Sequence, residues 1–289
     1  MIKLFIQGVR PKTLIAGIAP STCSYFLYLA EGNPPQLFIL SMCLGLAICI
    51  QIATNFYNDA IDFEKGTDIN RVGPKRVTGA ENLTSKSVFR IGHFFILLAF
   101  IFGIPLVVKG GVIFLLVGLF SLFLAYGYTG GPFPLAYLGL GELFVFIFFG
   151  FVATSGSYYL YSGNINISVI MLSIQLGLLS SVLIGVNNYR DRKTDVLTNK
   201  NTLATKLTEF QYLKLMDLFI FIPFVILLYF VFTVKLSFFI PMLAIGYGHQ
   251  IRHNLRFYSE ESELNYSLGL AGKMLGLFSI LFCLGSLWE

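Results

Sequence analysis

Residues 37–62 read LFILSMCLGLAICIQIATNFYNDAID, a long apolar run that ends in a cluster of amides and carboxylates. The polar members of this cluster are Asn55, Asn58, Asp59 and Asp62. About 20 apolar residues in an α-helix cross the roughly 30 Å of hydrocarbon in a bilayer. Carboxylates at the end of such a helix are costly to keep there. The stretch therefore predicts a transmembrane helix whose polar end carries a function.

The same arrangement occurs a second time in the chain. Another apolar run, about 166–188, leads into a second cluster formed by Asn187, Asn188, Asp191 and Asp195. Both clusters contain the pattern Asn-x-Tyr-x-Asp, in which Tyr57 and Tyr189 hold the central position. Because the pattern recurs after a comparable apolar run, the two clusters are predicted to share one task.

The composition is that of a membrane protein. The 289 residues are 56% hydrophobic and only 12% charged, far from the averages of soluble globular proteins. Nine apolar segments are long enough to cross a bilayer. They run over about 13–30, 36–57, 88–108, 111–128, 139–161, 166–188, 211–233, 236–252 and 265–287. The predicted fold class is therefore all-α, a polytopic membrane protein built as a bundle of about nine transmembrane helices.

The positions of the acidic clusters indicate an internal duplication. Each cluster follows the second helix of a set of four, which gives one repeat over about 10–130 and another over about 137–255. A final helix, about 265–287, completes a single transmembrane domain over residues 1–289. Parallel repeats related by a pseudo-two-fold axis are a known membrane architecture, and here they would bring the two clusters together.

Basic residues are unevenly distributed among the loops. All but three of the 20 basic residues lie at the N-terminus or in the loops after the second, sixth and eighth segments, the exceptions being Lys109, Lys235 and Lys273. Cytoplasmic loops carry an excess of Lys and Arg. The N-terminus and both acidic clusters are therefore predicted on the cytoplasmic side of the cell (inner) membrane, and the C-terminus outside. This topology accounts for the net charge of +5, so no nucleic-acid partner is predicted.

The spacing within the clusters favours a metal site. If the second apolar helix continues through its cluster, Asn55, Asp59 and Asp62 fall at i, i+4 and i+7 and share one face, and the second cluster has the same kind of spacing. Mg²⁺ takes one or two carboxylates and completes its octahedron with waters and substrate phosphates. The predicted metal ligands are Asp59, Asp62, Asp68, Asp191 and Asp195. The implied substrate carries a diphosphate.

Basic residues flank both clusters. Lys65, Arg71, Lys75 and Arg76 follow the first, and Arg190, Arg192, Lys193 and Lys206 surround the second. Cations beside metal-bound phosphates would offset the charge that develops on a leaving diphosphate, although each taken singly can also be a determinant of topology. Glu142, an acidic residue at membrane depth, either orients a substrate hydroxyl or pairs within the bundle.

These residues resemble a known family. Asn58-Asp59-x-x-Asp62 with Gly66-Thr67-Asp68, and Asn187-Asn188-x-Arg190-Asp191-x-x-x-Asp195, are similar to the two aspartate motifs of the UbiA superfamily of intramembrane aromatic prenyltransferases. Further stretches resemble its 1,4-dihydroxy-2-naphthoate polyprenyltransferase branch, namely Arg10-Pro11-Lys12-Thr13-Leu14, Gly73-Pro74-Lys75-Arg76, Tyr128-Thr129-Gly130-Gly131-Pro132-Phe133-Pro134-Leu135, Gly141-Glu142-Leu143-Phe144 and Thr202-Leu203-Ala204. The resemblance covers about residues 8–210. One departure is Asn201, where related sequences carry a basic residue, although Lys200 is adjacent.

The resemblance implies a nine-helix bundle around a cavity and an Mg²⁺-dependent transfer of a polyprenyl group from its diphosphate to an aromatic acceptor. It implies that two Mg²⁺ ions and the diphosphate are held by Asp59, Asp62, Asp191 and Asp195, with Asn55, Asn58 and Asn187 as polar support. Loosening of the diphosphate would give an allylic carbocation, which aromatic faces can stabilise. Tyr57, Tyr128 and Tyr189 are the candidates for this task. The acceptor of this branch, 1,4-dihydroxy-2-naphthoate, loses its carboxylate, which gives demethylmenaquinone, and the polyprenyl tail needs an apolar slot that opens to lipid.

Other functions remain open at this point. The acceptor can be another dihydroxynaphthoate isomer, 4-hydroxybenzoate or homogentisate. A cation-coupled transporter would also use intramembrane acids, but it places them near the bilayer midplane. A structural or lipid-binding membrane protein would carry the same acids as solvated loop charges.

Overall fold

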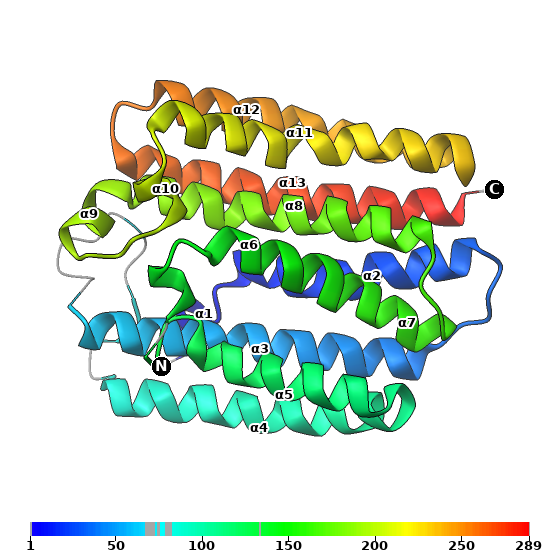
Figure 1. The fold of residues 1–289 in the computed structure, drawn as a ribbon, viewed down its shortest axis with the longest axis horizontal. Helices are drawn as coiled ribbons and strands as arrows, with labels where there is room; N and C mark the ends of the chain where they lie inside the picture. Colours follow the sequence, from blue (N-terminus) through cyan, green and yellow to red (C-terminus); the bar gives the residue numbers. More distant parts are fainter. Residues whose placement is uncertain (1, 67–72, 74–75, 79–82, 133, 289) are drawn as a thin grey trace.

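The computed structural model describes residues 2–66, 73, 76–78, 83–132 and 134–288. The regular structure within these ranges is entirely helical, and the long helices lie side by side in one bundle (Figure 1). In chain order the elements are α1 (Ile2–Val9), α2 (Pro11–Ala30), α3 (Leu37–Glu64), α4 (Ser85–Gly110), α5 (Val112–Gly127), η1 (Leu135–Tyr137), α6 (Gly141–Val145), η2 (Phe146–Ser155), α7 (Gly156–Ser162), α8 (Ile167–Arg190), α9 (Arg192–Leu197), α10 (Leu203–Lys206), α11 (Glu209–Thr233), η3 (Leu236–Ala244), α12 (Ile245–Phe257), η4 (Glu261–Glu263) and α13 (Leu264–Leu287). The predicted all-α fold class is confirmed.

Seven helical stretches of the described chain are long and apolar enough to cross a membrane. They are Pro11–Ala30, Leu37–Glu64, Ser85–Gly110, Gly141–Ser162, Ile167–Arg190, Glu209–Thr233 and Glu261–Leu287. Val112–Gly127 is a shorter apolar helix, and the eighth predicted segment is the 3₁₀ stretch η3 followed by α12. The chain is therefore a multi-pass membrane protein.

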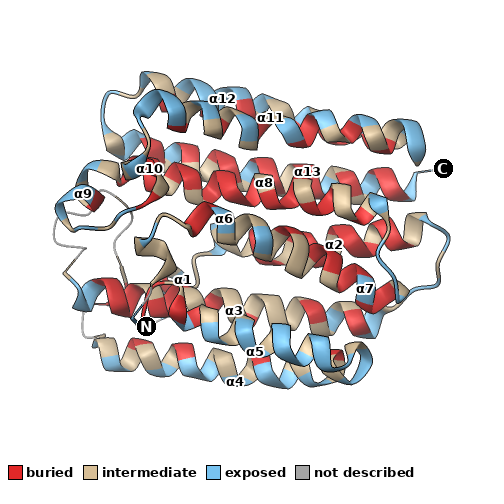
Figure 2. Cartoon of the chain, in the orientation of Figure 1, coloured by how far each residue is buried: buried red, intermediate tan, exposed pale blue. Residues whose placement is uncertain are grey.

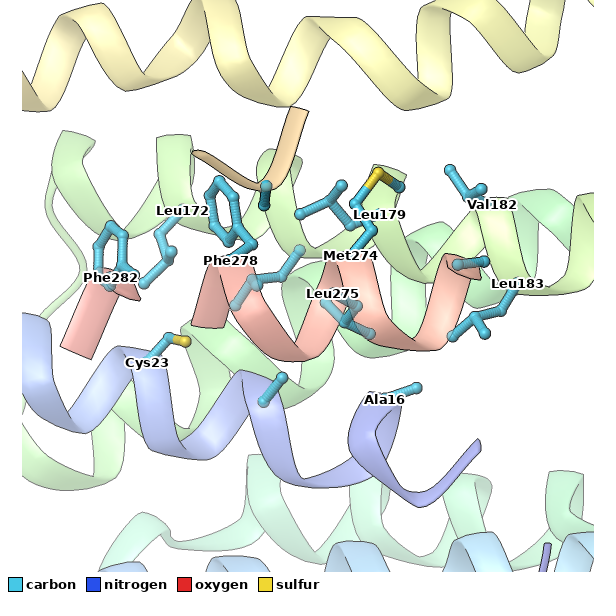
Figure 3. Packing of buried hydrophobic residues seen from close by; sticks show 14 of the residues in the cluster. Ala16, Cys23, Leu172, Leu179, Val182, Leu183, Met274, Leu275, Phe278 and Phe282 are labelled. Atoms are coloured by element: carbon cyan, nitrogen blue, oxygen red, sulfur yellow. The ribbon is translucent and has the colours of Figure 1, made fainter. Parts of the chain in front are cut away.

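Buried residues concentrate on α8 and α13 in the middle of the bundle, whereas α4 and α5 present exposed apolar side chains (Figure 2). In the core, side chains of α13 interdigitate with those of α8 and α2 (Figure 3). The labelled residues are Met274, Leu275, Phe278 and Phe282 of α13, Leu172, Leu179, Val182 and Leu183 of α8, and Ala16 and Cys23 of α2. Lipid tails are as apolar as these side chains, so it is close packing that favours helix association over lipid contact.

The stretch from α6 to α7 lies unusually close to α8. Its middle, η2, is π-helical. A Cβ added at Gly150 would lie 2.6 Å from the Ser173 carbonyl oxygen, and one at Gly177 would lie 2.7 Å from that of Phe146. Glycine at both positions is what permits this approach, and it sets Glu142 at the start of the stretch against the end of α8.

The two acidic clusters lie at the same end of the bundle, opposite the C-terminus (Figure 1). As expected, α3 continues through its cluster to Glu64. The second cluster differs from the expectation of one helix, because α8 ends at Arg190 and Asp195 belongs to α9. Asp191 has φ −87° and ψ 2° at this break. The backbone N–H of Asp195 still donates to the Asp191 carbonyl at 2.8 Å, which retains the helical step.

Candidate active site

A cavity of about 850 Å³ lies between the two acidic clusters and extends among apolar side chains. Its polar wall includes Arg10, Asn55, Asn58, Asp62, Arg76, Tyr128, Asn187, Asn188, Asp191 and Lys200. Residues of both clusters thus face one space, as the repeated pattern predicted. The predicted residues Asp68, Arg71 and Lys75 lie outside the described residues.

The carboxylates of the first cluster are buried and bound to arginines. Asp59 is 1% exposed and pairs with Arg10 and with Arg76, whose Nη1 lies 2.9 Å from Oδ1. Asp62 is 5% exposed and also pairs with Arg76. The Tyr137 hydroxyl donates to Asp62 Oδ1 at 2.9 Å. Arg76 thus bridges the two acids at the cavity wall.

Arg10 is a site residue that the sequence motifs do not identify, because it lies 49 positions from Asp59 in the chain. It has a φ of 52°, in the left-handed region that residues other than glycine rarely adopt. This conformation lies at the corner between α1 and α2. The Asn55 side chain fixes the corner by donating to the Val9 carbonyl oxygen at 3.0 Å. Asn55 thus ties α3 to the corner that carries Arg10, and its role as polar support for metal and diphosphate stays a prediction.

The second cluster is organised by Arg190, whose side chain is fully buried. Its Nε and Nη2 donate to the two oxygens of Asp191, both at 2.7 Å, and Nη2 also donates to Asn187 at 2.8 Å. Nη1 donates to Asn265 of α13 at 2.9 Å. Such a two-point contact fixes the plane of the carboxylate. Arg190 was predicted to bind diphosphate, but the structure places it behind Asp191 and off the cavity wall.

Asp195 lies beside Lys200, with 3.4 Å between Nζ and Oδ1. Its Oδ2 has no hydrogen-bond partner among the described residues. Burial, together with the negative charges of Asp191 and Asp62, raises the pKa of Asp195 to about 6, against the opposing effect of Lys200. Because Asp62 belongs to the first cluster, the two clusters share one electrostatic environment.

Tyr137 connects the basic residues of both clusters, and no sequence signal singled it out. The Lys65 ammonium lies 4.0 Å from the centre of its ring, and that of Lys200 lies at 5.8 Å. Lys65 also donates to the Thr129 carbonyl oxygen at 2.8 Å. Partial burial and the charge of Lys200 lower the pKa of Lys65, while Asp62 opposes this shift. Lys65 and Lys200 therefore share one aromatic ring, but of the two only Lys200 lines the cavity.

The remaining predicted cations point elsewhere. Arg192 donates to the Leu207 carbonyl oxygen at 3.1 Å, and Lys206 donates to that of Leu138 at 2.7 Å. Lys193 forms an exposed ion pair with Glu261. None of these three side chains lines the described cavity.

Of the three predicted tyrosines, one lines the cavity and two pack against other aromatic rings. Tyr128 lines the cavity, whereas Tyr57 does not and packs edge-on against His93 of α4 and Tyr126 of α5. Tyr189 stacks on Tyr212 with ring centres 5.7 Å apart and donates to Glu209 at 2.8 Å. The structure therefore gives Tyr57 and Tyr189 packing contacts. The cavity instead presents five phenylalanine rings, those of Phe100, Phe114, Phe144, Phe148 and Phe149.

Two further predicted residues, Asn58 and Glu142, form hydrogen bonds between segments of the bundle. The Thr129 hydroxyl donates to Asn58, which ties the segment after α5 to α3. Glu142 is 1% exposed and accepts hydrogen bonds from Asn188 Nδ2 at 2.9 Å and from the Tyr212 hydroxyl at 2.8 Å. Of the two roles predicted for Glu142, pairing within the bundle is thus present in the structure.

The described residues contain no ready-made group of three or more His, Cys, Asp or Glu side chains arranged for a metal ion. The four aspartates are held instead in two sets by basic residues. They nevertheless fit Mg²⁺, which needs only one or two carboxylates when a substrate supplies phosphate oxygens. Asp62 and Asp191 face the cavity, and Asp195 has an unpartnered oxygen. This donor set suits an ion that binds together with a phosphorylated ligand.

Comparison with known proteins agrees with this geometry. A model of the UbiA prenyltransferase family matches residues 18–275. A 1,4-dihydroxy-2-naphthoate octaprenyltransferase of Haemophilus influenzae is 33% identical over 214 residues, which cover 71% of this chain and 70% of that protein. The enzyme of the same name from Escherichia coli is 32% identical over 212 residues, covering 71% and 68%.

A solved structure has the same fold. The UbiA homologue from Archaeoglobus fulgidus bound to DMAPP and Mg²⁺ superposes with a TM-score of 0.68 over 98% of this chain and 97% of that one, at 16% identity. The family match covers most of the chain, and both aspartate motifs lie within it at one cavity. The chain belongs to the UbiA prenyltransferase family.

Proposed function

We propose that this protein transfers a polyprenyl group from polyprenyl diphosphate to 1,4-dihydroxy-2-naphthoate, with release of diphosphate and of the carboxylate as CO₂, to give demethylmenaquinol, the reduced form of demethylmenaquinone. The observation that carries the proposal is the cavity of about 850 Å³, which is charged between the two aspartate motifs and apolar beyond them. A substrate with a diphosphate head and a hydrocarbon tail matches both parts. The curated relatives named above support the choice of acceptor.

The polar end of the cavity would hold the diphosphate. Asp59, Asp62, Asp191 and Asp195 would hold Mg²⁺, which we take to be two ions, and Mg²⁺ supplies positive charge that offsets the negative charge of the leaving group. Arg10, Arg76 and Lys200 also line this end. Their guanidinium and ammonium groups can donate to phosphate oxygens, and charge-assisted donors of this kind stabilise the departing diphosphate.

The apolar part of the cavity would protect the reacting carbon from water. The bond between the allylic carbon and oxygen breaks, and its electron pair leaves with the diphosphate. Phenylalanine faces such as those of Phe144 and Phe148 stabilise the remaining positive charge electrostatically. The acceptor ring donates an electron pair to the allylic carbon, and loss of CO₂ returns an electron pair to the ring, so that no separate base is required.

The tail of the donor would lie between helices and reach the lipid. Several cavity residues on α4 and α5 are also exposed on the outer surface of the bundle, among them Phe100, Ile104, Val108, Leu115 and Leu119. A cavity wall that is also lipid-facing lets a long hydrocarbon chain enter sideways. Substrates and products would then exchange through the bilayer.

We also infer the topology and the repeats from the arrangement of the helices. Nine membrane segments would form a single domain over residues 1–289, with α2 to α5 as one repeat, α6 to α12 as the other and α13 added. The polar end, with its excess of Lys and Arg, would face the cytoplasm of the inner membrane. The alternative of a cation-coupled transporter is less well supported, because the aspartates lie at helix ends among basic residues and α8 has no charged residue in its middle.

The experiment is a prenyl-transfer assay with purified protein in lipid nanodiscs, labelled polyprenyl diphosphate and a panel of aromatic acceptors. We expect product only with Mg²⁺, and most rapidly with 1,4-dihydroxy-2-naphthoate. Chelation by EDTA should stop the reaction and fresh Mg²⁺ should restore it. Preference for 4-hydroxybenzoate or homogentisate would overturn the assigned acceptor. Metal-driven ion flux without any prenylated product would overturn the enzymatic function.

A further inference from the structure

One corner of the cavity wall carries a side-chain amide. It is formed by Asn188 of α8, by Tyr128 after α5 and by Gly141 at the start of α6. A Cβ added at Gly141 would lie 2.9 Å from the Tyr128 hydroxyl and 3.9 Å from Asn188 Nδ2. Tyr128 and Asn188 line the cavity, whereas Glu142 and Tyr212 lie behind them. The corner is polar and adjoins Asp191 of the second aspartate motif.

The orientation of the Asn188 amide follows from its partner. Glu142 Oε1 accepts hydrogen bonds from Asn188 Nδ2 at 2.9 Å and from the Tyr212 hydroxyl at 2.8 Å. A carboxylate oxygen can only accept, so the amino side of the amide must face Glu142. The amide oxygen then points the other way. Asn188 is 6% exposed and lines the cavity, and the hydrogen bond that its side chain makes to a described residue is the one from Nδ2 to Glu142.

This arrangement makes Glu142 a positioning residue. Its free oxygen, Oε2, is buried without a partner in the described part of the chain and does not reach the cavity. Direct contact between Glu142 and a substrate hydroxyl is therefore not what the geometry provides. The carboxylate acts through Asn188 by fixing which end of the amide faces the cavity.

We infer that Asn188 Oδ1, held by Glu142 and Tyr212, accepts a hydrogen bond from a ring hydroxyl of the aromatic acceptor. This subsite rests on the proposed function and adds to it the residue that recognises the acceptor. In 1,4-dihydroxy-2-naphthoate the 1-hydroxyl is adjacent to the carboxylate and donates to it within the molecule. The 4-hydroxyl has no such internal partner. The 4-hydroxyl is therefore the group that donates a hydrogen bond to Asn188 Oδ1.

The test compares the binding of two acceptors to wild type and variants. Nanodisc-embedded protein is loaded with Mg²⁺ and a donor analogue that has a methylene group in place of the reacting oxygen, so that no turnover occurs. The dissociation constants of 1,4-dihydroxy-2-naphthoate and of 1-hydroxy-2-naphthoate, which lacks the 4-hydroxyl, are measured under reducing conditions. We expect wild type to bind the dihydroxy compound about tenfold more tightly, the upper range for one hydrogen bond.

Asn188→Ala should lose this preference, with the two constants agreeing within about twofold. Glu142→Leu should lose it as well, because the amide is then free to rotate, whereas Glu142→Gln should keep it because its amide oxygen can still accept. Ser181→Ala is the matched control, since the Ser181 hydroxyl contacts the Glu142 backbone carbonyl at 3.2 Å without lining the cavity. Binding of the donor analogue should be the same in all of these proteins.

The outcomes separate this inference from the proposed function. If wild type binds both acceptors equally, or if Asn188→Ala and Glu142→Leu retain the preference, the subsite is wrong while the proposed function stands. If wild type binds the donor analogue but neither naphthoate, the assigned acceptor and the subsite both fail. Because two ligands are compared on one protein, misfolding is excluded as the cause of a lost preference. A damaged site would weaken the binding of both ligands together.

Discussion

Replacement of Arg190 by leucine should destabilise the protein through the charge that it leaves behind. The Arg190 guanidinium makes hydrogen bonds of 2.7–2.9 Å to Asp191, Asn187 and Asn265, and its side chain is fully buried. Removing one member of a buried ion pair costs about 3–5 kcal/mol, because the other charge stays buried without compensation. We expect the free energy of unfolding to fall by that amount in Arg190→Leu.

The second half of the prediction is that the loss is relieved by neutralising the partner. The double variant Arg190→Leu/Asp191→Asn should recover most of this loss of about 3–5 kcal/mol, since removing both charges of a buried pair leaves no uncompensated charge. Mg²⁺ should stabilise the single variant more than wild type, because an ion can compensate Asp191 when the guanidinium is absent. Reversible unfolding in mixed micelles, with and without Mg²⁺, measures all of these quantities. A single variant within 1 kcal/mol of wild type, or a double variant no more stable than the single, would refute the reasoning.

Three further predictions follow from the site. Asp59→Ala or Asp191→Ala should abolish prenyl transfer while leaving membrane insertion intact, and near-normal product formation in both would contradict the metal assignment. Gly118→Leu adds a side chain to the cavity wall at a position where a Cβ meets no atom within 4 Å, so this variant should fold normally but prefer donors with shorter prenyl chains. Gly246→Leu is the control, because a Cβ at Gly246 is equally unobstructed but lies away from the cavity. An unchanged preference for prenyl chain length in Gly118→Leu would count against the proposed tail path. Because the pKa of Asp195 is raised to about 6, a proton competes with the metal for this carboxylate below that pH. The affinity for Mg²⁺, measured by titration calorimetry, should therefore weaken as the pH falls through 6. An affinity that does not change between pH 5 and pH 8 would exclude Asp195 as a ligand.

Much of the site was accessible from sequence because its chemistry is concentrated in two short motifs. Spacing along a helix fixes which residues share a face, so Asn55 and Asp62 could be predicted together, and both line the cavity. The repeated pattern similarly predicted that Asp191 would meet Asp62 across one space. Long apolar runs predicted the membrane helices, since their length and composition depend on local sequence alone.

Contacts between distant segments were not accessible in this way. Arg10 reaches Asp59 from 49 positions away, and Tyr137 reaches Asp62 from 75 positions away. Helical spacing gives no information on how each helix is rotated within the bundle, which is why Tyr57 and Tyr189 were expected at the cavity and pack elsewhere. Long flexible side chains such as Arg192 and Lys206 can reach several partners, so proximity in sequence did not identify the ones they contact.

The sequence by itself determined an all-helical membrane protein with two repeated acidic helix ends, because hydropathy and side-chain spacing act within single segments. Only the tertiary structure decided which cations pair with Asp59, Asp62 and Asp191, which aromatic rings face the cavity, and that Glu142 turns the Asn188 amide oxygen toward it. These outcomes depend on the rotation and close approach of helices, most directly where Gly150 and Gly177 let α8 pack against the α6 to α7 stretch. Such packing is a property of surfaces that meet only after the chain has folded.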